Sequence, residues 1–219
     1  MNYIAVDFSL NSPGICLYND KSKKYRFIAY LKPKTGTKKE QLLQEELTLL
    51  KDVTIVTQPD FTNDENFSGS ELAKVKRYDK MADDIINLIL QESFPGDSFT
   101  IAFEGASYGS KTGTNNMIDM AAGAAILKLK MLKTLQPEDL LTVAPTSIKK
   151  FAGKGNMNKI QVLEAFVNNT IDDKSLLKSQ FYQKICELEF GSKIPKPVDD
   201  LVDAFFLAAM IASTAPSPD

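Results

Sequence analysis

The sequence predicts an α/β domain built on a mixed five-stranded sheet that is flanked by helices. Near the amino terminus, short apolar and β-branched segments are separated by tight turns, a pattern typical of an antiparallel meander of three strands. Further along, strand-like and helix-like segments alternate, which favours two parallel strands connected through helices. The chain has 219 residues, 43% of them hydrophobic, which is enough to bury the core of one domain.

The three strands of the meander are predicted at residues 3–6, 15–18 and 25–31. The first is wholly apolar and is followed directly by Asp7, after which Pro13 and Gly14 indicate a turn. Asn19 and the aspartate after it favour a second tight turn. We therefore expect Asp7 at the end of a buried strand.

The next part of the chain is more weakly patterned. It predicts a loop at 32–39, a helix at 40–50, a minor strand at 53–57 and a polar loop at 58–68, in which nothing suggests chemistry. From Ser70 to Ile89, apolar residues recur at helical spacing, which predicts a long amphipathic helix.

In the second half of the chain, strands and helices alternate. The apolar strand at 99–103 delivers Glu104, and a last strand is predicted at 141–144. Further helices are predicted at 116–133, from Pro145 onward, at 158–167, at 172–189 and from about residue 198 onward. We expect a single domain over 1–213, with 214–219 as a flexible tail. Two buried strands thus end in an acid, at Asp7 and at Glu104.

Composition excludes several kinds of chemistry. The chain has no histidine, which rules out Ser-His-Asp and Cys-His catalysis and metal sites with histidine ligands. Two cysteines, Cys16 and Cys186, are too few for a disulfide framework or a zinc site and favour a reducing compartment. The longest wholly apolar run, 204–212, is too short to cross a bilayer, and no leader pattern opens the chain. We expect a cytoplasmic protein without a membrane segment.

Positive charge is segregated along the chain although the net charge is only -2. Residues 21–39 hold eight Lys/Arg and no Asp/Glu, and a second basic stretch, from Lys128 to Lys159, includes Lys149, Lys150 and Lys154. Such stretches are as often a solvated face as a nucleic-acid surface, so both interpretations stay open. Gly153-Lys154-Gly155 lacks the Lys-Ser/Thr order of a Walker loop, and we therefore expect no nucleotide cofactor.

The last helix opens with acids just before a long apolar run. Asp200 and Asp203 are three residues apart and share one helix face. Capping or the helix dipole accounts for Asp199 or Asp200 but leaves Asp203, one turn inside, unexplained. Together with Asp7 and Glu104, these two acids can converge at one edge of the sheet. An all-carboxylate site of this kind suits Mg²⁺ or Mn²⁺, and two ions about 3.5–4 Å apart could assist attack on phosphorus.

Several segments together resemble the RuvC family of Holliday-junction resolvases, within the RNase H-like nuclease superfamily. Each is weak alone, but their order is specific, and they cover most of 1–31 and 70–212. The segments are Ile4-Ala5-Val6-Asp7 with Ser12-Pro13-Gly14-Ile15, then Ile101-Ala102-Phe103-Glu104, then Ala144-Pro145-Thr146-Ser147-Ile148-Lys149-Lys150 with Gly153-Lys154-Gly155 and Lys159-Ile160-Gln161-Val162, and last Asp200-Leu201-Val202-Asp203-Ala204. Two departures stand out: Asp7-Phe8-Ser9 replaces the Asp-Pro-Gly that is usual in the family, and 32–68 resembles an insertion.

The resemblance implies an RNase H-like fold and a Mg²⁺-dependent endonuclease, with Mn²⁺ as a substitute, that resolves four-way junctions by paired nicks. It implies that two metal ions bind to Asp7, Glu104, Asp200 and Asp203. The DNA contacts that it implies fall on Tyr108, which stands near the family's base-contacting aromatic residue, and on Lys111, Lys149, Lys150, Lys154 and Lys159. Paired cutting implies a homodimer, for which the thin Met/Ala face of the helix between Met117 and Met131 is our candidate.

Three alternatives remain open at this point. The chain could be another RNase H-like nuclease of the ribonuclease H or terminase type. It could also be a non-catalytic junction-binding protein. It could, third, be half of an actin-like ATPase, whose first strand also ends in Asp. That interpretation requires a second repeat of the fold, which a chain of this length cannot easily hold.

Overall fold

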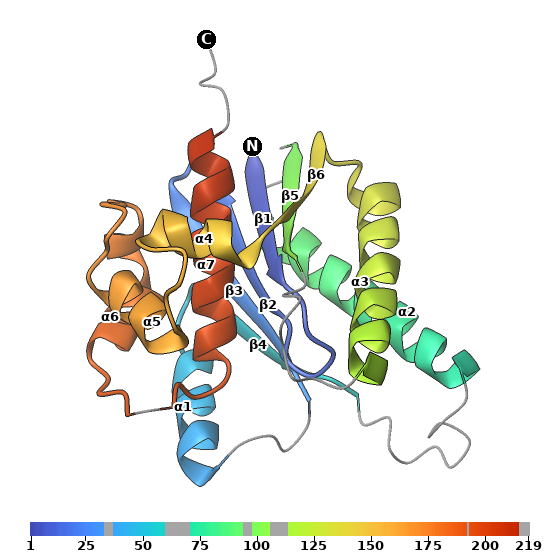
Figure 1. Ribbon diagram of the computed structural model, residues 1–219, viewed down its shortest axis with the longest axis horizontal. Coiled ribbons are helices and arrows are strands. Elements are labelled where there is room, and N and C mark those ends of the chain that lie inside the picture. Colours follow the sequence, from blue (N-terminus) through green and yellow to red (C-terminus); the bar gives the residue numbers. More distant parts are fainter. Residues whose placement is uncertain (33–36, 60–70, 94–97, 106–113, 192, 215–219) are drawn as a thin grey trace.

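The computed structural model describes residues 1–32, 37–59, 71–93, 98–105, 114–191 and 193–214. Its centre is a mixed sheet with strand order β4-β3-β2-β1-β5-β6 (Figure 1). The strands are β1 (Asn2–Asp7), β2 (Gly14–Asn19), β3 (Lys24–Leu31), β4 (Val53–Thr57), β5 (Phe99–Glu104) and β6 (Asp139–Val143). As predicted, β1 to β3 form an antiparallel meander, β5 pairs in parallel with β1, and β6 pairs in parallel with β5.

The α/β class is confirmed, but the prediction of five strands is wrong by one. Val53–Thr57, expected only as a minor strand, pairs in parallel with β3 and forms one edge of the sheet. The segment is rich in β-branched residues, and its register places Ile55 beside Ala29 of β3. The described part of 32–68 therefore extends the sheet, while its status as an insertion and the extent of the domain stay predictions.

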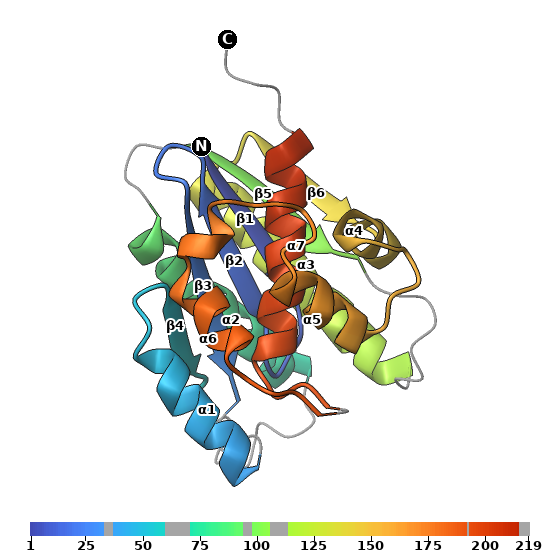
Figure 2. The same ribbon diagram turned by 90° about the vertical axis from the view of Figure 1, so that its left-hand side faces the viewer.

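Helices cover both faces of the sheet in the described part of the chain. They are α1 (Lys38–Thr48), α2 (Glu71–Glu92), α3 (Thr114–Leu135), α4 (Pro145–Ala152), α5 (Lys159–Val167), the short 3₁₀ helix η2 (Leu176–Lys178), α6 (Gln180–Cys186) and α7 (Val198–Thr214). Figures 1 and 2 show α7 lying along one face with α4, α5 and α6 around it, and α2 and α3 on the opposite face. Among the described residues, every helix is too short or too polar to cross a bilayer.

One core lies on each face of the sheet. On the α7 face, Phe205 and Phe206 are fully buried and make edge-on contacts with Phe166 of α5. Burying a side chain of this size contributes about 1.5–3 kcal/mol, so α7 is anchored mainly by its apolar run. On the other face, Ile85 and Ile89 of α2 pack in a separate cluster that includes residues of β1 and β3. The anchored α7 holds its acidic first turn against the sheet.

The prediction of one helix over 172–189 is wrong in its first half. This segment contains the short η2 and then α6 in place of a continuous helix. Asn169 and Asp172 adopt positive φ angles of 46° and 51°, which interrupt the helical path. The Asp173 side chain then accepts hydrogen bonds from the backbone N–H groups of Ser175 and Leu176. Local side-chain bonds of this kind compete with helix formation.

The thin face of α3 is covered from within the same chain. A Cβ placed on Gly123 would lie 3.0 Å from Cζ of Phe8 and 3.1 Å from Cδ2 of Leu10. Leu127 and Met131, on the same side, are completely buried in the core. This side of the helix, which was the candidate dimer face, is therefore internal packing, and any contact between two copies through α3 must use its outer side.

Candidate metal centre

Three of the four predicted acids come together at one edge of the sheet. Asp7 ends β1 and Glu104 ends β5, and these strands are parallel neighbours in which Val6 pairs with Phe103. Asp203 reaches the same point from the second turn of α7. One carboxylate oxygen of each acid lies within 4.8 Å of those of the other two. We call Asp7, Glu104 and Asp203 the carboxylate triad.

A glycine lets α7 approach close enough to complete the triad. Gly14 opens β2 and pairs with Asp7 across the meander. A Cβ at Gly14 would lie 2.6 Å from the backbone oxygen and 2.8 Å from the Cβ of Asp200. Any larger residue here would push the first turn of α7 away from the strand ends.

Burial and mutual repulsion disfavour the charged forms of the triad. Burial raises the pKa of Asp7 well above its ordinary value, and repulsion from Glu104, Asp200 and Asp203 raises it further. Burial, together with Asp203, raises the pKa of Glu104 to about 7 against the opposing charge of Lys149. Burial likewise raises the pKa of Asp203 to about 6. A cation bound among these oxygens would remove this repulsion.

The triad fits a hard divalent cation. It offers carboxylate oxygens only, which are the ligands preferred by Mg²⁺ and Mn²⁺, and it is part-buried rather than freely solvated. Its members lie on two strand ends and a buried helix, so the ligand positions are set by the most rigid part of the fold. Asp7, Glu104 and Asp203 are the residues that would hold the ion.

Asp200, the fourth predicted ligand, lies beside the triad but is held by other partners. One carboxylate oxygen, Oδ2, accepts a hydrogen bond of 2.9 Å from the Ser12 hydroxyl. The other, Oδ1, accepts a hydrogen bond from the Lys196 ammonium in a close ion pair. Burial and Asp199 raise the pKa of Asp200, whereas Lys196 and Ser12 lower it.

The main contacts of Asp199 are ion pairs, and helix capping is secondary. It occupies the second position of α7, where its negative charge also suits the helix dipole. Its Oδ2 lies 2.6 Å from Nζ of Lys159 and 3.1 Å from Nζ of Lys196. Its Oδ1 is buried without a hydrogen-bond partner in the described part of the chain.

The predicted DNA-binding lysines divide into two groups. Lys149 and Lys159 carry charges that lower the pKa of Glu104, so both act on the triad electrostatically. Lys150 and Lys154 are exposed, on α4 and in the turn after it. Tyr108 and Lys111 lie outside the described residues.

Sequence reasoning missed two residues of the site, Ser12 and Lys196. Ser12 lies in the turn that was already matched to the family, and a hydroxyl there can reach a facing helix. Lys196 precedes Asp199 and Asp200 by three and four residues, a spacing that allows ion pairs once the chain is helical or tightly turned. The spacing could therefore have predicted these ion pairs, but the connector before α7 has no periodic pattern that would have placed Lys196 next to the helix.

Comparison with known proteins bears on the fold. The sequence matches no model of a known protein family and no curated protein. Among solved structures, Thermus thermophilus RuvC in complex with a Holliday junction substrate matches with a TM-score of 0.51 and 10% identity, covering 98% of this chain and 97% of that chain. The chain has the RuvC fold. A second Thermus thermophilus RuvC structure gives a TM-score of 0.48, 11% identity and 96% coverage of both chains. The yeast mitochondrial Holliday junction resolvase Ydc2 matches with a TM-score of 0.48 and 15% identity, covering 94% of this chain and 75% of that chain.

The RuvC fold confirms the family resemblance at the level of structure. It includes the antiparallel meander followed by parallel strands that the RNase H-like interpretation required. At 10% identity, the match supports the fold and leaves the chemistry to be argued from the site.

Proposed function

We propose that the protein is a divalent-metal-dependent DNA endonuclease that resolves four-way junctions. The observation that carries the proposal is the carboxylate triad, which two neighbouring strand ends and a facing helix place together in a RuvC fold. A matched RuvC is described in complex with a Holliday junction substrate, which supports branched DNA as the ligand class here.

In this proposal, Asp7, Glu104 and Asp203 hold Mg²⁺, for which Mn²⁺ can substitute. A bound ion supplies an activated water and stabilises the leaving oxygen of the scissile phosphate. The chain's own contribution is to fix the three carboxylates on strand ends and a helix and to supply the positive charge of Lys149, which acts on Glu104 and Asp203. Such a charge suits a phosphate group of the DNA backbone.

We further propose a homodimer, in which two sites act on the two strands of a twofold-symmetric junction. The outer side of α3 presents an apolar stripe whose members recur at alternating intervals of four and three residues, as in a coiled-coil seam. Its exposed residues are Ile118, Ala122, Ala125, Leu129 and Leu132. Ile118, Leu129 and Leu132 are 61%, 51% and 49% exposed, and their alignment in one stripe makes a patch rather than scattered apolar residues.

The test is cleavage of a mobile four-way junction with each strand labelled in turn, in Mg²⁺ and in EDTA. We expect symmetric nicks in Mg²⁺, and Asp7→Asn and Glu104→Gln variants that still bind the junction but cut it no faster than the buffer control. Glu164→Gln, an exposed residue of α5, is the matched control and should cut normally.

Substrate comparison separates the alternatives. Preference for an RNA:DNA hybrid would favour a ribonuclease H, and preference for linear duplex would favour a terminase-type nuclease. Tight junction binding without cleavage in Mg²⁺ or Mn²⁺ would favour a non-catalytic binding protein. Asp7→Asn and Glu104→Gln variants that cut as well as the wild type would refute the assignment of the metal centre.

A further inference from the structure

Lys196 provides the acids at the start of α7 with a positive charge from within the chain. Its ammonium is shared between Asp200 and Oδ2 of Asp199, the latter at 3.1 Å. Both acids are buried, with relative exposures of 7% for Asp199 and 4% for Asp200, so their negative charges need nearby partners. The Ser12 hydroxyl accounts for the remaining oxygen of Asp200.

Charge matching separates these acids into two sets. Asp199 and Asp200 face two ammonium groups, those of Lys159 and Lys196, and this set of four is neutral as a whole. Among the described residues, the charges that act on the triad of Asp7, Glu104 and Asp203 come from Lys149, Lys159 and Lys196, and two of these three lysines already belong to the set of four. The charge of Asp200 is therefore already neutralised by its partners, and the uncompensated negative charge lies at the triad.

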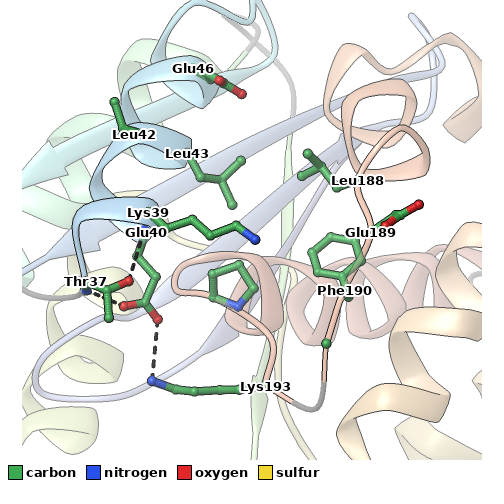
Figure 3. Close-up of a pocket in the computed structure, with 12 residues that line it drawn as sticks. Thr37, Lys39, Glu40, Leu42, Leu43, Glu46, Leu188, Glu189, Phe190 and Lys193 are labelled. Carbon is green, nitrogen blue, oxygen red and sulfur yellow. Dashed lines mark hydrogen bonds and ion pairs between the residues drawn. The ribbon is translucent and has the colours of Figure 1, made fainter.

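The segment that carries Lys196 is tied to α1. The Gln44 side-chain amide donates a hydrogen bond of 3.2 Å to the backbone oxygen of Lys196. Nearby, Nζ of Lys193 lies 3.5 Å from Oε1 of Glu40, an ion pair visible in Figure 3. Glu40 and Lys193 line a pocket of about 410 Å³ between α1 and residues 188–191, 193 and 195. The bond from Gln44 is separate from this pocket and fixes the backbone of Lys196 against α1.

We infer that Lys196 stands in place of a second metal ion: the centre takes one divalent cation on Asp7, Glu104 and Asp203, while Lys196 holds Asp200 out of the ligand set. The inference rests on the proposed metal-dependent function and refines it, since the sequence alone suggested two ions and four ligands. Lys196 is in this view a positioning residue, because it acts on Asp200 and through it on the composition of the centre.

The test is a titration of the purified full chain with MnCl₂ in the absence of DNA. Calorimetry counts the ions bound per chain, and electron paramagnetic resonance distinguishes an isolated Mn²⁺ from a spin-coupled pair. We expect one isolated ion in the wild type and in Lys196→Arg, and two coupled ions in Lys196→Met, in which Asp200 is released. Lys193→Met, on the same connector but paired with Glu40, is the matched control and should bind one ion.

The outcomes are distinct for the inference and for the proposed function. Two ions in the wild type, or one ion in a Lys196→Met variant whose circular dichroism shows native folding, would overturn the role of Lys196 and leave a metal-dependent nuclease standing. No Mn²⁺ binding in the wild type would overturn both. If Lys196→Met fails to fold, Lys196→Gln, which also removes the charge, takes its place and should bind two coupled ions, whereas one ion in a folded Lys196→Gln variant would overturn the inference.

Discussion

Removing one charge from the triad should stabilise the metal-free protein at neutral and alkaline pH. The pKa of Glu104 is raised, chiefly by burial and by Asp203, from its ordinary 4.5 to about 7. In the unfolded chain the group ionises near its ordinary pKa, so between these two values the folded state binds more protons than the unfolded state. Stability from this group is therefore lost as pH rises through that window.

The size of the effect follows from the shift. One pKa unit corresponds to about 1.36 kcal/mol, so the rise from 4.5 to about 7 corresponds to about 3 kcal/mol above pH 7. Glu104→Gln removes the charge and should raise the free energy of unfolding by up to that amount at pH 8 in EDTA. In a chain of 219 residues this is an increase of about 6–12 °C in Tm. At pH 4.5 the two proteins should differ little.

Urea denaturation provides the measurement, followed by circular dichroism because the chain has no tryptophan. Mg²⁺ should remove most of the difference in stability, since an ion at a hundred times its Kd stabilises the folded wild type by about 2.7 kcal/mol, and Glu104→Gln lacks one ligand. Glu164→Gln should follow the wild type throughout. A Glu104→Gln variant that is less stable than the wild type in EDTA at pH 8, with an unchanged pH profile, would refute the electrostatic reasoning.

Two further predictions concern the surfaces around the centre. Leu129→Glu places a charge in the apolar stripe of α3 and should make the protein monomeric by analytical ultracentrifugation, whereas Thr134→Glu, outside the stripe on the same helix, should not; a dimer in both would exclude this face. Lys149→Gln should weaken junction binding and reduce the slope of log affinity against log salt by about one, while Lys174→Gln, at an exposed residue before η2, should leave the slope unchanged. Equal slopes in the two variants would remove Lys149 from the DNA surface.

Much of the fold could be predicted because its signals are local. The strands of the meander are apolar and bounded by turn residues such as Pro13 and Gly14, and α2 shows clear helical spacing. β4 was underestimated because a five-residue edge strand depends on pairing with β3 more than on its own sequence. The break before α6 was missed because it depends on side-chain bonds made by Asp173, which compete with the helix without altering apolar spacing.

The site was predictable to the extent that strand ends and helix spacing determine it. Asp7 and Glu104 follow apolar strands, and parallel neighbours bring their ends to one edge, so their meeting follows from topology. The spacing of Asp200 and Asp203 indicated one helix face but could not assign different partners to the two acids. That difference depends on Lys196, which lies in a connector without periodic pattern, and on Ser12, far away in the sequence.

The different positions of Asp200 and Asp203 follow from the way α7 meets the sheet. The first turn of the helix lies against the start of β2, where Gly14 leaves room for the backbone of Asp200. Asp200 is consequently pressed over the start of β2, within reach of the Ser12 hydroxyl and of the lysine that precedes the helix. Asp203, one turn further along, lies instead beside Asp7 and Glu104. Two acids on one helix face therefore meet different surroundings, and the close contact at Gly14 brings one to the triad and the other to Lys196.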